Sequence, residues 1–253
     1  SGDTILYMAF VDGQDASFFR DGSGNGNNFD PSGLQNYDVV PDNSTNNWCT
    51  INPLSSLGTQ SEGNLKTVTT TSGYSSTVGS IGQTSGKWYW EVIPVTNVSG
   101  APLIGVVDET YDSVNGSSAV GYLLSGGKDS IAYYNNGSSY INGTVNSSYG
   151  ASYVGDDIIG VALNLDDDEI TFYKNGVSQG AISHTFSGGN ILPAVSDGTN
   201  AAGQTFAFNF GQDSSFAGTK TPQGNTDDNG RGDFYFSPPS GYLSLCTQNL
   251  SAP

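Results

Sequence analysis

The chain has 253 residues, 35 of them Gly, and a formal net charge of −17 from 7 Lys and Arg against 24 Asp and Glu. This length and composition fit one large domain of short strands joined by many turns, with few of the residues that fill helices. The charge argues against nucleic acid or anionic lipid as a partner, since both require a basic footprint, and no apolar run approaches the ~20 residues of a membrane span.

The first residues of the chain are predicted to form a strand outside the main domain. Residues 4–11 (TILYMAFV) are apolar, and residues 12–31 are rich in Gly, Asn and Asp, which is typical of a loop. An exposed apolar strand is an edge that pairs with another strand, so we expect residues 1–11 to complete a neighbouring module or subunit. We therefore divide the chain into a lead-in over residues 1–36 and a β domain over residues 37–250.

Strand-length apolar runs follow one another from residue 64 onward, separated by Gly-rich turns roughly every 8 to 15 residues. No window shows convincing helical periodicity. The pattern predicts an all-β fold, a two-sheet antiparallel sandwich without substantial helix. The expected strands lie within residues 65–70, 86–95, 102–109, 119–127, 130–143, 155–176, 181–186, 191–196, 204–211 and 241–246.

The clearest of these segments is a hairpin over residues 155–176 (GDDIIGVALNLDDDEITFYKNG). Apolar and smaller residues alternate in its first half, a carboxylate-rich turn follows over residues 166–169, and Asn175-Gly176 supplies the positive φ angles of the next tight turn. Aromatic residues on this and neighbouring strands are expected to include the main buried rings of the sandwich. They are Trp88, Trp90, Phe172, Phe208 and Phe210.

The hairpin sequence resembles the signature of the SPRY (B30.2-type) domain, and residues 86–95 (GKWYWEVIPV) match the strand in which that family places a buried aromatic pair. Further matches follow in the family's order, so the resemblance implies the concanavalin-like jelly-roll sandwich of that family. Residues 37–54 (YDVVPDNSTNNWCTINPL) and 246–250 (CTQNL) resemble the lead-in and exit of SPRY modules in bacteriophage structural proteins.

The resemblance implies a non-enzymatic structural and binding module of a virion surface protein, such as a tail fibre, spike or capsid appendage. We expect it on the virion or outside the cell, among other virion subunits and as a homo-oligomer, because appendages are built from repeated copies. A host-surface glycan or protein is the expected ligand. Two alternatives stay open: an intracellular SPRY adaptor that binds proteins, and a polysaccharide-degrading sandwich, since lectin-like sandwiches host both binders and enzymes.

In the SPRY family, partners are held by loops at one end of the sandwich and by the adjoining concave sheet. The corresponding loops here follow the strands at residues 102–109, 130–143 and 204–211, and they carry aromatic rings and carboxylates that suit a sugar ring or an apolar peptide. Alternatively, these rings only cover the bases of the loops. The candidate ligand-binding residues are Tyr111, Asp112, Tyr140, Tyr149, Asp213 and Phe216.

Two loops rich in Gly and Asp carry oxygen ligands at spacings that suit Ca²⁺, the one cofactor that the sequence offers. The first copies the opening half of a calcium loop with Asp21, Ser23 and Asn25, but Ser32 stands where a glutamate is expected. Sequences this rich in Asp, Asn and Gly also form such patterns by chance. The second loop carries Asp227, Asn229 and Asp233.

The sequence contains no evident catalytic constellation. The single histidine, His184, has no second histidine or GxSxG motif to act with, so we expect a packed or exposed strand residue. Cys49 and Cys246 are expected to be buried free thiols, because free cysteine is commonly part of a core. In the SPRY family the first and last strands are neighbours, so a disulfide between them is the alternative.

Overall fold

The structure, a computed structural model, describes residues 21, 23–28, 32, 41–70, 74–95, 101–113, 119–121, 129–199 and 203–250. Two units make up the chain, Ser1–Val39 and Val40–Pro253. The strand predicted over residues 4–11 and most of the one predicted over residues 119–127 lie outside the described residues. All the strands named below belong to the second unit.

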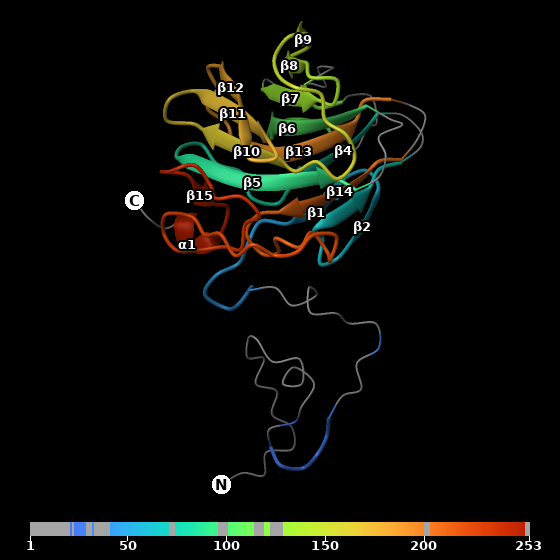
Figure 1. Cartoon of the computed structure of the whole chain (residues 1–253), viewed down its shortest axis with the longest axis vertical. Coiled ribbons are helices and arrows are strands. Elements are labelled where there is room, and N and C mark those ends of the chain that lie inside the picture. The colour runs from blue at the N-terminus through green and yellow to red at the C-terminus, as the bar shows by residue number, and fades with distance from the viewer. Residues whose placement is uncertain are drawn as a thin grey trace. The chain divides into compact units, whose positions relative to one another are not determined.

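The second unit is a sandwich of two largely antiparallel sheets, which confirms the predicted all-β fold (Figure 1). Helix in the described residues is limited to one turn, α1 (Thr247–Leu250). Sheet 1 has the order β1 (Ile51–Ser56), β4 (Ser75–Gly79), β13 (Ile191–Asp197), β6 (Pro102–Asp108), β7 (Ser130–Tyr134), β8 (Ser139–Ile141) and β9 (Thr144–Asn146). Sheet 2 has the order β12 (Val177–Ser183), β11 (Glu169–Lys174), β10 (Ile159–Asn164), β5 (Lys87–Pro94), β14 (Thr205–Asn209), β3 (Lys66–Val68) and β2 (Thr59–Ser61), with β15 (Leu243–Ser244) parallel to β5.

The predicted hairpin forms the middle of sheet 2. β10 and β11 pair antiparallel, from Ile159 opposite Lys174 to Asn164 opposite Glu169. Asp168 takes a φ of +57° in the turn between them, and the turn carries the predicted run of carboxylates. β10 pairs on its other side with β5, so the hairpin lies next to the strand that carries Trp88 and Trp90.

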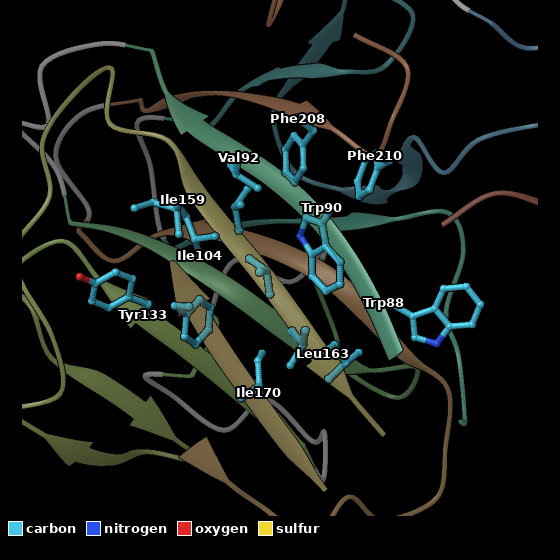
Figure 2. Packing of buried hydrophobic residues seen from close by; sticks show 14 of the residues in the cluster. Trp88, Trp90, Val92, Ile104, Tyr133, Ile159, Leu163, Ile170, Phe208 and Phe210 are labelled. Atoms are coloured by element: carbon cyan, nitrogen blue, oxygen red, sulfur yellow. The ribbon is translucent and has the colours of Figure 1, made fainter. Parts of the chain in front are cut away.

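The interior between the sheets is filled by alternate residues of these strands, as Figure 2 shows. Ile104 and Tyr133 enter it from sheet 1, and Ile170 enters it from sheet 2. The aromatic residues predicted for the core are all buried in this one cluster, so that prediction is confirmed. They are Trp88, Trp90, Phe172, Phe208 and Phe210.

Both sheets are also covered on their outer sides, which explains why β6 and β10 are buried along their whole length. The described part of the β6–β7 connection, residues 109–113, 119–121 and 129, packs on sheet 1 and is called strap 1. The β14–β15 connection, residues 210–242, covers sheet 2 and is called strap 2. In strap 1, the Val120 N–H donates to the Ser196 hydroxyl (2.9 Å). Gly121 follows with a φ of +71°, and a β-carbon there would lie 2.7 Å from a backbone nitrogen of the sheet. Only glycine lets the strap lie this close.

Strap 2 is anchored by a buried carboxylate. The Glu91 side chain is completely buried on the outer side of β5. Its Oε1 accepts hydrogen bonds from the Phe236 N–H (2.7 Å) and the Tyr89 hydroxyl (3.2 Å), and its Oε2 accepts from the Tyr235 N–H (2.9 Å) and the Asn209 amide (3.1 Å). Burial raises the pKa of Glu91 to about 7, and the hydrogen bonds oppose that rise. Two successive backbone N–H groups of strap 2 therefore donate hydrogen bonds to one carboxylate.

The two cysteines are buried and free, as expected. Their chain segments are neighbours, because the Cys49 N–H donates to the Leu245 carbonyl (2.8 Å) and Trp48 pairs with Cys246. Burial raises the pKa of Cys49 to about 11. The first and last parts of the sandwich therefore meet without a covalent link.

Four strands were not predicted from the sequence, namely β1, β2, β4 and β9. β4 shows why, because its Ser75, Ser76 and Thr77 are polar by sequence yet completely buried. Their hydroxyls bond to internal partners, for example Ser75 to the Leu57 carbonyl (3.2 Å). The strand expected over residues 181–186 is displaced, since β12 ends at Ser183 and His184 follows it.

Glu91 makes stability depend on pH. Its pKa of about 7 in the folded chain is above that of an unfolded glutamate, so its contribution is complete at low pH and is lost as the pH rises through 7. We expect the free energy of unfolding to fall by about 3 kcal/mol from this group between about pH 5 and pH 8. Urea denaturation followed by tryptophan fluorescence at several pH values measures this, and Glu91→Gln should remove the slope. The exposed Glu62→Gln is the control and should keep it. Parallel curves for the wild type and Glu91→Gln would contradict the assignment.

Candidate functional site

Half-buried tyrosine rings gather on the outer side of sheet 1. Tyr134 ends β7 and Tyr140 lies in β8, and their ring centroids are 5.9 Å apart in an edge-to-face arrangement. Tyr74, just before β4, packs against the same buried cluster, which includes Leu103. We call Tyr74, Tyr134 and Tyr140 the tyrosine patch. Such rings combine an apolar face with a hydroxyl, which suits the recognition of a protein or a sugar.

Some of the predicted ligand residues lie at or beneath this patch. Tyr140 belongs to it, whereas Tyr111 lies in the buried cluster under it and is 8% exposed. The Tyr111 hydroxyl is 3.0 Å from the Ser76 hydroxyl, and burial raises the pKa of Tyr111 to about 12. Asp112 follows on strap 1 and is half-buried. Tyr111 therefore supports the patch from below.

The other three predicted ligand residues lie elsewhere. The Tyr149 hydroxyl donates to the Gly180 carbonyl (2.7 Å) and accepts from the Phe172 N–H (3.2 Å), which closes the sandwich beside β12. Asp213 and Phe216 are buried in strap 2. The structure therefore does not bring the six residues together. Tyr149, Asp213 and Phe216 hold loops in place, and a ligand role for them stays a prediction.

Hydrogen-bond donors surround the carboxylate that leads the second predicted calcium loop. Asp227 Oδ1 accepts from the N–H groups of Asn229 and Arg231 (both 2.9 Å). Oδ2 accepts from the Ser244 N–H (3.0 Å) and hydroxyl (2.7 Å) and from the Asn249 amide (2.8 Å). Burial acts to raise the pKa of Asp227, but these donors together lower it below its usual value. Donors of the chain itself thus satisfy both oxygens.

The remaining calcium candidates are also bonded within their loops. Asp233 Oδ1 accepts from the Ser214 hydroxyl (2.6 Å). In the first unit, Asp21 accepts from the Ser23 hydroxyl (2.7 Å), and the Asn25 amide donates to that hydroxyl oxygen (3.1 Å). Among the described residues, no group of three or more His, Cys, Asp or Glu side chains is arranged to hold a metal ion. Calcium binding at either loop stays a prediction.

The single histidine belongs to a polar cluster that joins the two sheets. His184 Nε2 is 2.7 Å from Asp129 Oδ1, and the Ser187 N–H (2.7 Å) and hydroxyl both donate to Asp129 Oδ2. The Asp129 N–H donates to the Asp108 carboxylate (2.7 Å). Ser187 and His184 bond to the carboxylate and not to each other, so they do not form the serine–histidine–aspartate arrangement of hydrolases. The cluster ties the loop after β12 to the start of β7.

The sandwich, with loops packed on both outer faces and tyrosines at the surface, defines an all-β binding domain. The family profile of the SPRY domain matches residues 87–213, half of the chain, and the chain belongs to the SPRY domain family. SPRY domains are protein-interaction modules and are typically not catalytic. In the ranges that the structure describes, no helix is long and apolar enough to cross a membrane.

A solved structure of a SPRY domain shares the fold. The crystal structure of the SPRY domain of human HERC1 aligns with a TM-score of 0.52 at 20% identity, covering 62% of this chain and 96% of that chain. A second human SPRY domain aligns with a TM-score of 0.47 at 23% identity, covering 61% and 94%. No curated protein matches the sequence. At these identities the likeness shows the fold alone.

The tyrosine patch combines one predicted residue, Tyr140, with two that sequence reasoning missed, Tyr74 and Tyr134. For Tyr134 the signal was available, because successive residues of a strand point to opposite faces. Tyr133 is completely buried in the core, so its neighbour Tyr134 points outward. For Tyr74 no signal was available, because β4 was not predicted.

Calcium at the second loop would have to displace the hydrogen bonds that the oxygens of Asp227 accept from the chain, so we expect binding there to change the stability of the protein little. Asp227→Asn should lower the free energy of unfolding by about 1 to 3 kcal/mol, since its amide nitrogen would face donors. Thermal unfolding with about 1 mM calcium and with a chelator measures the first effect, at a concentration that fills weak extracellular sites. A calcium-dependent rise in melting temperature that Asp227→Asn abolishes would show a metal site after all.

Proposed function

We propose that this chain is a non-enzymatic structural and binding module of a virion surface protein, a tail fibre, spike or capsid appendage. Its ligand is a protein or glycan on the surface of the host cell, bound at the tyrosine patch. Membership of a family of interaction modules supports the binding role. The bacteriophage-like sequences at the two ends of the domain support the virion setting.

The observation that carries the proposal is the way these two end sequences meet. The Asn47 N–H donates to the Thr247 hydroxyl (2.9 Å), and the Thr247 N–H donates back to the Asn47 carbonyl (2.8 Å). The Gln248 N–H donates to the Asn46 side chain (3.1 Å). Residues 46–47 and residues 247–248 are therefore hydrogen-bonded to each other where the sandwich begins and ends. The sequences TNN at residues 45–47 and CTQN at residues 246–249, which resemble those of bacteriophage modules, thus have a structural role. The hydrogen bonds also bring both ends of the module to one place.

The charge distribution supports a role outside the cell. Lys87 pairs with Asp167 (2.8 Å) and Lys174 pairs with Asp157 (3.2 Å), so these cations are neutralised by local carboxylates. The surface stays acidic overall, which opposes binding to nucleic acid and to anionic lipid. Exposed ion pairs contribute little, so screening by salt costs the fold little.

Binding to bacterial cells tests the proposal. We expect the labelled protein to bind some bacterial strains of a panel and not others. Tyr134→Ala and Tyr140→Ala should each weaken this binding about tenfold, because each substitution removes one ring of the tyrosine patch. Val177→Ala is the control, since that side chain is 66% exposed on sheet 2. Thermal unfolding shows whether the variants keep their fold. If both tyrosine variants bind as well as the wild type, the site lies elsewhere. If the protein binds no strain and instead captures a cytosolic protein, the intracellular adaptor is favoured.

A further inference from the structure

Strap 2 covers only part of the outer side of sheet 2 and leaves β11 and β12 open. β12 lies at the edge of the sheet, next to β11 (Figure 1). All residues of β10 are buried, whereas burial alternates along β11 and β12 is mostly exposed. Ile170 and Phe172 face the core, so Thr171 and Tyr173 face outward, and Ala181 of β12 lies opposite Thr171. The open face is a strip of small and hydroxyl-bearing side chains that ends at Tyr173.

A second tyrosine stands beside this strip, where strap 2 returns to the sheet. Tyr242 and Tyr173 are both half-buried and pack on the same buried cluster, which includes Phe234. Burial raises the pKa of Tyr242, and the nearby Tyr173 adds to the rise. Asn164 is itself buried and bonds to Asp167, since its amide donates to Asp167 Oδ2 (2.8 Å) and its oxygen accepts from the Asp167 N–H (3.1 Å).

Charged groups lie near Tyr242, at the end of the strip opposite Tyr173. Glu169 lies opposite Asn164 in the sheet, and Asn164 lies opposite Lys87. The Lys87 ammonium is 2.8 Å from the Asp167 carboxylate, and these side chains are 35% and 61% exposed. Carboxylate acceptors and an ammonium donor therefore reach solvent near Tyr242, at the end of the strip away from Tyr173. We call Tyr173 and Tyr242, with this border of Lys87, Asp167 and Glu169, the tyrosine shelf.

We propose that the tyrosine shelf is a carbohydrate-binding site for a neutral oligosaccharide. Aromatic faces stack on the apolar C–H faces of sugar rings, and a few placed polar groups fix the orientation of the ligand. A sugar hydroxyl both donates and accepts, so it can bond to the carboxylate and the ammonium at once. The border carboxylates and the net charge of −17 oppose sulfated, phosphorylated or carboxylated glycans.

The shelf is independent of the tyrosine patch, because the two lie on the outer sides of different sheets. It also does not require the virion setting. Loss of cell binding through Tyr134 or Tyr140 and loss of sugar binding through Tyr173 or Tyr242 are therefore separate results, and either proposal can fail alone.

Nuclear magnetic resonance titration of the full chain with defined sugars tests the proposal. The probes are hexasaccharides of glucose in α- and β-linkage, of mannose and of N-acetylglucosamine, with a heparin hexasaccharide as the anionic comparison. We expect at least one neutral probe to shift the amide signals of Thr171, Tyr173 and Tyr242, and heparin to shift none of them. Tyr173→Ala and Tyr242→Ala should each weaken binding about tenfold, whereas Tyr140→Ala should leave it unchanged.

A further variant keeps the test decisive if a tyrosine substitution disturbs the fold. Glu169→Gln changes only a half-exposed charge, and we expect it to weaken the same titration severalfold while the spectrum stays folded. The proposal is overturned if no neutral probe shifts the shelf signals. It is equally overturned if the shifts map to sheet 1, persist in folded Tyr173→Ala and Tyr242→Ala variants, or are larger with heparin. Shelf signals that move only with an added peptide would assign the surface to a protein partner instead.

Discussion

The structure depends on how strap 2 is held against sheet 2, and Glu91 is the group that holds it. A carboxylate in a buried position is costly unless donors surround it, and here two backbone N–H groups, an amide and a hydroxyl supply those donors. The backbone donors belong to Tyr235 and Phe236, so the carboxylate fixes the strap itself and not only a side chain. With the strap in place, Phe216 and Phe234 bury the outer sides of β5 and β10.

The two straps also decide which surfaces remain for ligands. Strap 1 covers the centre of sheet 1 and leaves the tyrosine patch half-buried at its border. Strap 2 stops before β11, which leaves the tyrosine shelf beside its return to the sheet. Among the described loop residues, Tyr111, Phe216 and Phe234 are buried against the sheets. The half-buried rings named above come from strands and from the borders of the straps. Tyr134 and Tyr173 are strand residues that point away from the core.

The sequence predicted the fold well, whereas it did not predict which candidate site residues are buried, for a physical reason. Strands that fill the core, such as those of the hairpin and the Trp90 strand, carry large apolar residues at alternate positions, so local pattern and burial agree. β4 was missed because its buried hydroxyls look like those of a loop. Tyr111 and Phe216 were expected at a ligand because they lie in loops that correspond to the partner-binding loops of the SPRY family. Both are buried, because burial of a loop ring depends on tertiary contacts that the local pattern does not contain.

Amide hydrogen exchange of strap 2 tests the central claim most directly. If Glu91 anchors strap 2, the amides of Tyr235 and Phe236 should exchange as slowly as those of β5. Their hydrogen bonds to Glu91 open only when the strap leaves the sheet. In Glu91→Gln the same two amides should exchange much faster while those of β10 stay protected. Fast exchange at Tyr235 and Phe236 in the wild type, at the rate of an exposed loop, would contradict the account.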